Sequence, residues 1–181
     1  AKADYLKEDW SAATEKLQAL LRTNSEYLPA QMLMGQLQLY QGNLGQAEAY
    51  LAVVVQAVPS NRDARRLLAE ARLRQNKAKE ASDALKPIID AGNADVQMLA
   101  MAAIASRNAG DYDEAIALLQ LRADQDPGNP DLLIDLASAL ISMGRIEDAQ
   151  MVLHKLDGAT GATGYRKDAL SIIAAARDGD F

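Results

Sequence analysis

Small and apolar residues recur along this chain at a constant interval of 34 residues. One register holds an alanine that is followed four residues later by a leucine. A second register holds a glycine or alanine. The residues of these registers are Ala13, Ala47, Ala81, Ala115, Ala149, then Leu17, Leu51, Leu85, Leu119, Leu153, then Gly35, Ala69, Ala103 and Ala137. A fixed period between about 20 and 50 residues indicates repeated copies of one supersecondary unit.

Turn-forming residues follow the same period. Gly42, Asn76, Gly110 and Gly144 each come seven residues after a small residue of the second register. Glycine and asparagine are the residues that most readily adopt the left-handed conformation at the end of a helix. A second break in each unit is marked by turn residues, and Asn129 followed by Pro130 is a typical helix start. Each unit is therefore predicted to hold two helices joined by a tight bend.

The small residues predict where the two helices of a unit cross. Antiparallel helices approach closely only where side chains are short, so Gly35 or Ala69 should face Ala47 or Ala81. The leucines are predicted to fill the space between successive hairpins, which a single hairpin cannot bury by itself. The pattern predicts an all-α fold built of stacked hairpins.

The repeat resembles the tetratricopeptide repeat. The resemblance rests on the small pair at the crossing, on Gly110-Asp111-Tyr112 opening a second helix, and on Asp126-Pro127 closing it. It implies a helix-turn-helix solenoid forming a right-handed superhelix, with about five repeats and a partial terminal helix. It also implies a non-catalytic scaffold whose first helices line a concave groove for a protein or peptide. The expected units of the single array are 1–27 (partial), 28–61, 62–95, 96–129, 130–164 and 165–181 (partial).

Several short runs resemble a narrower group, the tetratricopeptide lipoproteins of bacterial exosortase (PEP-CTERM) systems. These runs begin at Tyr27, Leu33, Gln46, Ala64 and Leu85. The resemblance implies a bacterial envelope component linked to exopolysaccharide or protein sorting, placed in the periplasm or held at a membrane by a lipid. The lipid-bearing cysteine of such proteins is absent from this sequence. A cytoplasmic location, and a regulatory or substrate-presenting segment of a larger enzyme, are the alternatives.

Both ends of the sequence are predicted to fall inside a repeat of a longer array. Counting back by the period makes residues 1–7 the tail of a first helix, with a bend before Trp10. Residues 165–177 read as another first helix, and Gly179-Asp180-Phe181 as the bend after it. Residues 157–164 are glycine-rich, shift the period by one residue, and are predicted to form a flexible linker. The uncapped ends allow self-association.

Composition excludes several functions. The formal net charge of −6 disfavours nucleic acid as a partner, and the lack of cysteine removes disulfides and thiol chemistry. No pairing of nucleophile with base, and no pair of carboxylates in a cleft, is visible, so we predict no enzyme activity and no cofactor. No apolar run approaches the roughly 20 residues that span a bilayer.

A helical-wheel projection of the first helices predicts the residues that line the groove. The predicted partner-binding residues are Met32, Gln36, Leu39, Arg66, Glu70, Arg74, Ile104, Arg107, Ser138 and Ile141, with Leu73, Ala100 and Ile134 in the same rows. Arg66, Arg74 and Arg107 could form a basic patch for an acidic peptide or anionic polymer. The alternative is an ordinary solvated face in which Arg66 pairs with Glu70.

Other chemistry-bearing residues have plainer interpretations. His154 has no second histidine with which to bind a metal, and is predicted to lie on the surface. Residues Asp124, Asp126, Asn129 and Asp131 lack calcium-loop spacing and are predicted to serve turns and caps. Trp10 and Tyr112 occupy the same place in their units and are predicted to pack within hairpins. Met34, Met98 and Met101 are also predicted to pack in the core. Met32 suits either packing or a flexible binding surface.

Overall fold

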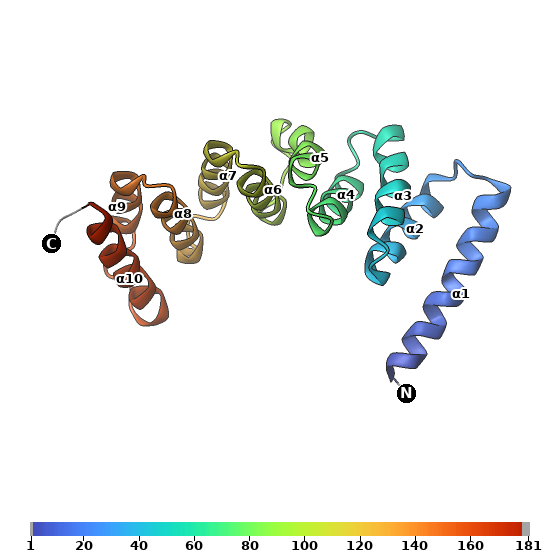
Figure 1. Ribbon diagram of the computed structural model, residues 1–181, viewed down its shortest axis with the longest axis horizontal. Coiled ribbons are helices and arrows are strands. Elements are labelled where there is room, and N and C mark those ends of the chain that lie inside the picture. The colour runs from blue at the N-terminus through green and yellow to red at the C-terminus, as the bar shows by residue number, and fades with distance from the viewer. Residues whose placement is uncertain (1, 179–181) are drawn as a thin grey trace. The chain divides into compact units, whose positions relative to one another are not determined.

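Ten α-helices follow one another along the chain in the computed structural model, which describes the backbone of residues 2–178 and the side chains of residues 10–177 (Figure 1). The helices form two units, one up to Ala94 and one from Asp95 onward. Successive helices within each unit pack against one another as pairs. The predicted all-α fold of helical hairpins is confirmed.

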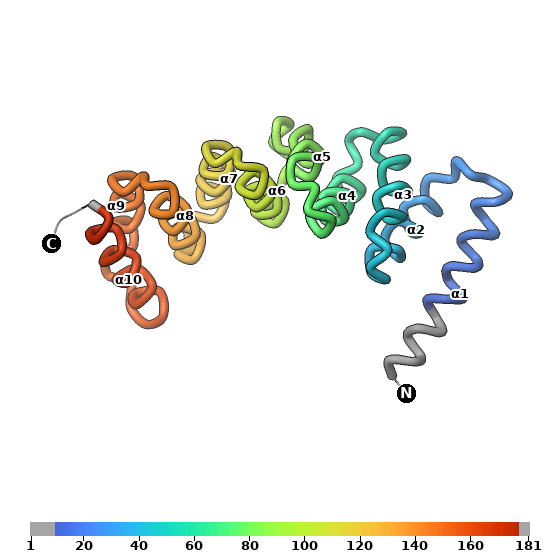
Figure 2. Tube along the Cα trace, in the orientation of Figure 1, coloured from blue at the N-terminus to red at the C-terminus, as the bar shows by residue number. Residues whose placement is uncertain are grey.

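The first unit contains five helices. They are α1 (Lys2–Thr23), α2 (Leu28–Gln41), α3 (Leu44–Ala57), α4 (Arg62–Arg74) and α5 (Ala78–Asp90). The second unit also contains five, namely α6 (Val96–Ala109), α7 (Tyr112–Gln125), α8 (Pro130–Ser142), α9 (Ile146–His154) and α10 (Gly161–Asp178). Figure 2 traces the path of the chain through them. In hairpin order, α2, α4, α6, α8 and α10 are first helices, and α1, α3, α5, α7 and α9 are second helices.

The bends inside the hairpins have the predicted backbone geometry. Gly42, Gly110 and Gly144 adopt φ angles of 81°, 87° and 73°, and Asn76 adopts a φ of 61° without being glycine. Two of the second breaks are capped by asparagine side chains, since Asn61 accepts a hydrogen bond from the Ala64 amide and Asn129 from the Asp131 amide. The predicted cap at Asn129 is thus confirmed.

The close approach of α2 and α3 is centred on Gly35. A Cβ atom added there would lie 2.6 Å from the Cγ and 2.8 Å from the Cδ2 of Leu51. Ala47, Ala69 and Ala81, which were predicted to lie where helices cross, are fully buried. Leu51 was predicted to fill the space between successive hairpins. In the structure it packs against Gly35 inside its own hairpin. A glycine is needed at this crossing because the leucine fills the space that a methyl group would take.

Neighbouring first helices also contact each other where their side chains allow it. In the first unit, Leu67 and Ala71 of α4 are buried, and α4 contacts α2. The Arg74 Nη1 donates to the Leu39 carbonyl of α2 at 3.0 Å. In the second unit α10 contacts α8, Ala174 is buried, and Arg177 donates to the Ile141 carbonyl of α8. Both arginines thus cap a carbonyl near the end of the preceding first helix, where the helix dipole favours a cation.

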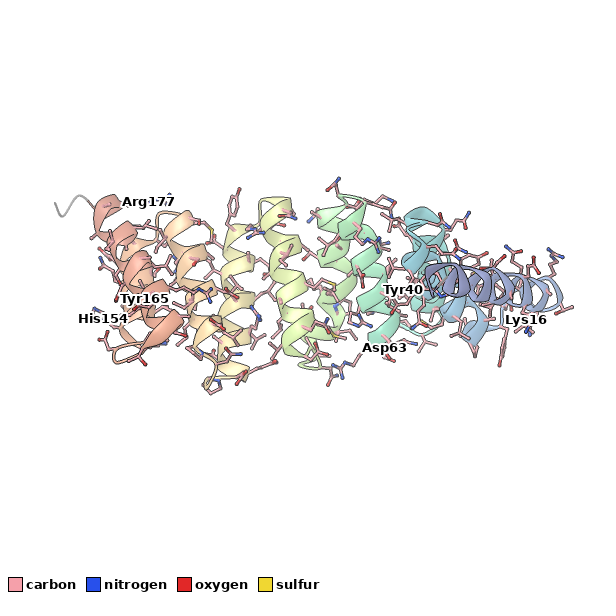
Figure 3. The ribbon with its side chains drawn as sticks, turned by 90° about the horizontal axis from the view of Figure 1, so that it is seen from below. Lys16, Tyr40, Asp63, His154, Tyr165 and Arg177 are labelled. Carbon is pink, nitrogen blue, oxygen red and sulfur yellow. The ribbon has the colours of Figure 1, made fainter. Side chains whose placement is uncertain are left out.

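Helix α1 corrects one sequence-based prediction. It continues without a break from Lys2 to Thr23, whereas a bend was predicted before Trp10. The residue 34 positions before Gly42 is Glu8. A residue with a Cβ atom adopts the left-handed bend conformation only at a cost, so the helix continues through this position. The Trp10 and Tyr40 rings lie 5.9 Å apart between α1 and α2, and Figure 3 shows Tyr40 beside α1.

The glycine-rich segment after α9 is shorter than predicted. Helix α10 begins at Gly161, four residues before the predicted start at Tyr165, so the predicted linker 157–164 is helical over its last part. Gly164 is buried, and a Cβ atom there would lie 2.6 Å from the Ala159 carbonyl oxygen. Gly164 therefore allows close backbone packing. The bend predicted at Gly179-Asp180-Phe181 lies outside the described residues.

Candidate binding site between α6, α7 and α8

A pocket of about 980 Å³ opens in the second unit between α6, α7, α8 and the start of α9. Ile104 and Arg107 come from α6, Leu119 and Arg122 from α7, and Ser138 from α8. The complete lining is Ala100, Ala103, Ile104, Arg107, Tyr112, Asp113, Ala115, Leu119, Arg122, Asp135, Ser138, Ala139, Ser142, Met143 and Arg145. The volume is at the upper end of the range of about 300–1,000 Å³ that is usual for ligand pockets.

The pocket lies where the backbones of α6 and α8 stand apart. Within the described part of the second unit, no Cα atom of α6 lies within 8 Å of a Cα atom of α8, although α8 and α10 do approach this closely. Asp135, Ala139 and Ser142 are three of the α8 residues that line the pocket. They stand 68 positions after Leu67 and Ala71, which are buried residues of α4, and after Arg74, which bonds to α2. Polar and short side chains thus replace the leucine and the arginine of the closed contact.

The middle of the pocket is apolar. The Ile104 side chain is 45% exposed there, and Leu119 and Met143 are partly buried beside it. Ala103, Ala115 and Ala139 complete this part of the lining. Residues of α7, among them Ala115 and Leu119, form the floor of the pocket between α6 and α8. An exposed isoleucine over such a floor can receive an apolar side chain from another molecule.

Charged residues stand at the two ends of the pocket. Toward the start of α8, the Arg122 Nη1 donates to Asp135 at 3.1 Å, and Arg166 lies 3.7 Å from the same carboxylate. At the end where α6 and α8 finish, Arg145 lies 2.6 Å from Asp148 and 4.0 Å from Asp113. Each lining carboxylate therefore has an arginine within ion-pair distance.

Polar groups that could serve a ligand are present along the pocket. The Ser138 and Ser142 hydroxyls donate to the Ile134 and Ser138 carbonyls, so each hydroxyl oxygen remains able to accept a hydrogen bond. The Nε of Arg122 is buried and has no hydrogen-bond partner among the described residues. The lining thus combines an apolar centre with acceptors and cations at its edges.

The structure brings three of the predicted groove residues together in this pocket, namely Ile104, Arg107 and Ser138. Two other predictions are wrong. Leu39 and Ile141 are only 2% and 3% exposed, so neither can contact a partner with its side chain. Both lie beneath the next first helix, whose arginine bonds to their carbonyls. Ile134, from the same rows, is also buried.

The predicted groove residues of the first unit do not line the pocket between α6, α7 and α8. Met32, Gln36, Arg66 and Glu70 are partly exposed, and Arg74 is exposed. The predicted pair of Arg66 with Glu70 is replaced, since Glu70 lies 4.0 Å from Arg74. A partner-binding role for these residues stays a prediction.

Three basic residues near the predicted basic patch, Arg65, Arg72 and Lys77, have structural roles. Arg65 is buried and donates to the Pro59 carbonyl at 2.5 Å and to the Ala84 carbonyl at 2.8 Å, and burial lowers the pKa of its guanidinium. Arg72 and Lys77 bind one carboxylate, Glu48 of α3, at 2.9 and 2.6 Å. The two contacts with Glu48 join α3 to α4 and to the turn that follows α4. These hydrogen bonds and ion pairs leave Arg65, Arg72 and Lys77 unsuited to binding a partner.

Glu48 is the centre of this cluster. Gln75 also donates to it, at 3.0 Å. Burial acts to raise the pKa of Glu48, but the hydrogen bonds from Lys77, Arg72 and Gln75 outweigh burial and leave the pKa below its ordinary value. The carboxylate is therefore charged near neutral pH and stabilises the packing of α3 on α4.

His154 lies on the surface as predicted, with a side chain that is 78% exposed. Its Nδ1 lies 3.3 Å from Asp157, which also accepts a hydrogen bond from Lys167 at 2.6 Å. The hydrogen bond from Lys167, followed by that from His154, lowers the pKa of Asp157. A smaller cavity of about 390 Å³ adjoins this group. In Figure 3, His154 and Tyr165 lie at one end of α10 and Arg177 at the other.

Among the described residues, no group of three or more histidine, cysteine, aspartate or glutamate residues is placed to hold a metal ion. In the same residues, no helix has both the length and the apolar character needed to cross a bilayer.

Sequence reasoning missed part of the pocket. Tyr112 was predicted to pack inside its hairpin, but it is 52% exposed and lines the pocket. Arg122 and Asp135 were not identified as site residues at all. A comparison of Asp135 and Ser142 with Leu67 and Arg74 in the same register could have found the opening, because the change from apolar and long to polar and short is visible in the sequence. The packing prediction is confirmed for Met34 and Met98, which are buried.

Comparisons with known proteins agree with the fold. A family model described as tetratricopeptide repeat matches residues 38–105 and 107–176, and a second model of that description matches residues 1–61. No curated protein sequence matches the chain significantly.

Among solved structures, the chain is similar to MamA from Desulfovibrio magneticus RS-1, with 17% identity and a TM-score of 0.70 over 86% of this chain and 88% of that one. It is also similar to YrrB, described as a TPR protein with an unusual peptide-binding site, with 14% identity and a TM-score of 0.66 over 92% and 94%. A tetratricopeptide repeat protein from Parabacteroides merdae gives 14% identity and a TM-score of 0.61 over 97% and 72%. At these identities the similarity shows a shared fold.

Proposed function

Because this chain belongs to the tetratricopeptide repeat family, we propose that its second unit binds a segment of a partner protein in the pocket between α6, α7 and α8. Proteins of this family are generally non-catalytic scaffolds that bind other proteins. One observation carries the proposal, namely the separation of α6 from α8. In the same unit, the next pair of first helices, α8 and α10, pack against each other.

The open contact leaves surface that a partner can bury. Ile104 and Tyr112 are 45% and 52% exposed at the pocket, and burying an apolar side chain stabilises a complex in proportion to the area removed from water. The serine hydroxyl oxygens can accept hydrogen bonds from backbone amides of a bound segment. A segment in extended conformation suits this arrangement, because its amides are free to donate to groups along the pocket wall.

The proposal can be tested with peptides selected from a random library of short sequences displayed against the whole chain. Peptides that bind the pocket should lose about tenfold in affinity or more with Ile104→Glu, because a charge would replace the apolar centre. Ile172→Glu is the matched control, since Ile172 of α10 is also exposed but does not line the pocket. Failure to select any peptide, or equal binding to both variants, would contradict the proposal.

We further propose that this protein works in a bacterial envelope, in the periplasm or held to a membrane by a lipid, as part of an exopolysaccharide or protein-sorting system. The support is the resemblance of the runs beginning at Tyr27, Leu33, Gln46, Ala64 and Leu85 to the lipoproteins of exosortase systems. Fractionation of cells of the native organism that carry the tagged protein tests this location. Recovery of the tagged protein only from the cytoplasm would refute it.

A further inference from the structure

We infer that the pocket between α6, α7 and α8 selects partner segments that carry an acidic side chain close to an apolar one. This inference rests on the proposed function and names the chemistry of the partner. The acidic group would pair with Arg107, and the apolar group would pack on Ile104 and Leu119.

The charges of the lining favour an incoming carboxylate over an incoming ammonium group. Both lining carboxylates are already within 4.0 Å of an arginine, Asp135 beside Arg122 and Asp113 beside Arg145. Arg107 is exposed, and no ion pair is found for it among the described residues. A partner's carboxylate would therefore gain an arginine that has no competing carboxylate, and a guanidinium can bind it through two parallel hydrogen bonds.

The spacing of the two subsites limits the sequence of the partner. Arg107 follows Ile104 by three residues on α6, which corresponds to a rise of about 4.5 Å along the helix. Side chains on one face of an extended segment are two residues apart, at about 6.6–6.8 Å. The long arginine side chain can span the difference. An acidic and an apolar residue separated by one residue thus fit the pocket.

The end of the pocket next to Arg107 is open because of Ser142. In the closed contacts, an arginine stands at this register position, and it bonds to the preceding first helix through the Leu39 or the Ile141 carbonyl. Ser142 is too short to make such a bond and lines the pocket instead. Ser142→Arg should therefore reach the Arg107 carbonyl, fill this end of the pocket, and reduce binding without removing Arg107.

The experiment uses glycine- and serine-rich peptides that contain Leu-Ser-Glu, Leu-Ser-Gln or Leu-Ser-Lys, together with the three reversed orders. Each is titrated into the whole chain while methyl resonances of Ile104 and Leu119 are followed by NMR. The Glu peptides should bind about fivefold more tightly than the Lys peptides, as expected for the upper range of an exposed ion pair. Arg107→Glu should reverse this preference, and Ser142→Arg should weaken both.

Arg22→Glu is the control for net charge, because Arg22 is an exposed residue of α1 in the first unit. It should leave the preference unchanged. Equal affinity of the Glu and Lys peptides for the Ile104 methyl site would overturn the inference and leave the proposed function intact. If neither these peptides nor library-selected peptides shift the methyl resonances of Ile104 and Leu119, both the inference and the proposed function are wrong. A preference that Arg107→Glu does not change also overturns the inference.

Discussion

Replacing Gly35 with alanine tests the packing of α2 on α3 directly. The added methyl carbon would lie 2.6 Å from the Cγ of Leu51, whereas carbon atoms in contact are ordinarily about 3.5–4.0 Å apart. Leu51 is fully buried and cannot move into solvent. The helices must separate or the leucine must leave its preferred rotamer.

The expected magnitude is the difference between two effects. Overpacking of this kind costs about 1–3 kcal/mol, and alanine in place of glycine inside a helix returns about 1 kcal/mol. We therefore expect Gly35→Ala to lower the free energy of unfolding by about 1 kcal/mol. In a Leu51→Ala background the clash is removed and the methyl fills part of the cavity, so Gly35→Ala should then raise stability by about 1 kcal/mol.

Urea unfolding followed by circular dichroism, together with amide hydrogen exchange in α2 and α3, measures both effects. Exchange is needed because repeat arrays can open locally without unfolding as a whole. Ala69→Gly serves as the control, since Ala69 occupies the same register position in the next hairpin and should lose stability. The reasoning is refuted if Gly35→Ala has the same effect in both backgrounds, because the two residues would then not be coupled.

The remaining predictions concern local features of each unit. Asn76→Ala should lower stability by about 1 kcal/mol and Asn76→Gly should not, because Asn76 has a φ of 61°, and thermal unfolding of both variants checks this. Glu48→Gln should cost about 1 kcal/mol at pH 7. Because the folded chain lowers the pKa of Glu48, its stabilisation is complete above the ordinary carboxyl pKa of about 4.3 and is lost as the pH falls. Urea unfolding at pH 7 and pH 3 should therefore differ less for Glu48→Gln than for the wild type. Gly164→Ala should loosen the start of α10 from the loop that precedes it, because its methyl would lie 2.6 Å from the Ala159 carbonyl oxygen, and faster hydrogen exchange at the start of α10 would show it.

The first helices show how far a helical wheel can predict a binding surface. Ile104, Arg107 and Ser138, three of the predicted groove residues, line the pocket where α6 and α8 stand apart. Leu39 and Ile141 occupy the same kind of position but are buried under α4 and α10. The wheel gives the direction of a side chain, whereas the neighbouring helix decides its exposure.

The sequence by itself determined the helical repeat of this protein. Period, turn residues and small crossing residues act locally or within one hairpin, so they predicted the bends at Gly42 and Gly110 and the burial of Ala47 and Ala69. The missing bend at Glu8 could also be read from its position in the period.

Only the tertiary structure decided which contacts between first helices close. Arg74 joins α4 to α2 by a hydrogen bond to the Leu39 carbonyl, whereas the shorter Ser142 lines the pocket between α6 and α8. These outcomes depend on distances between residues more than 30 positions apart in sequence. Such distances follow from how whole helices pack, which no local pattern specifies.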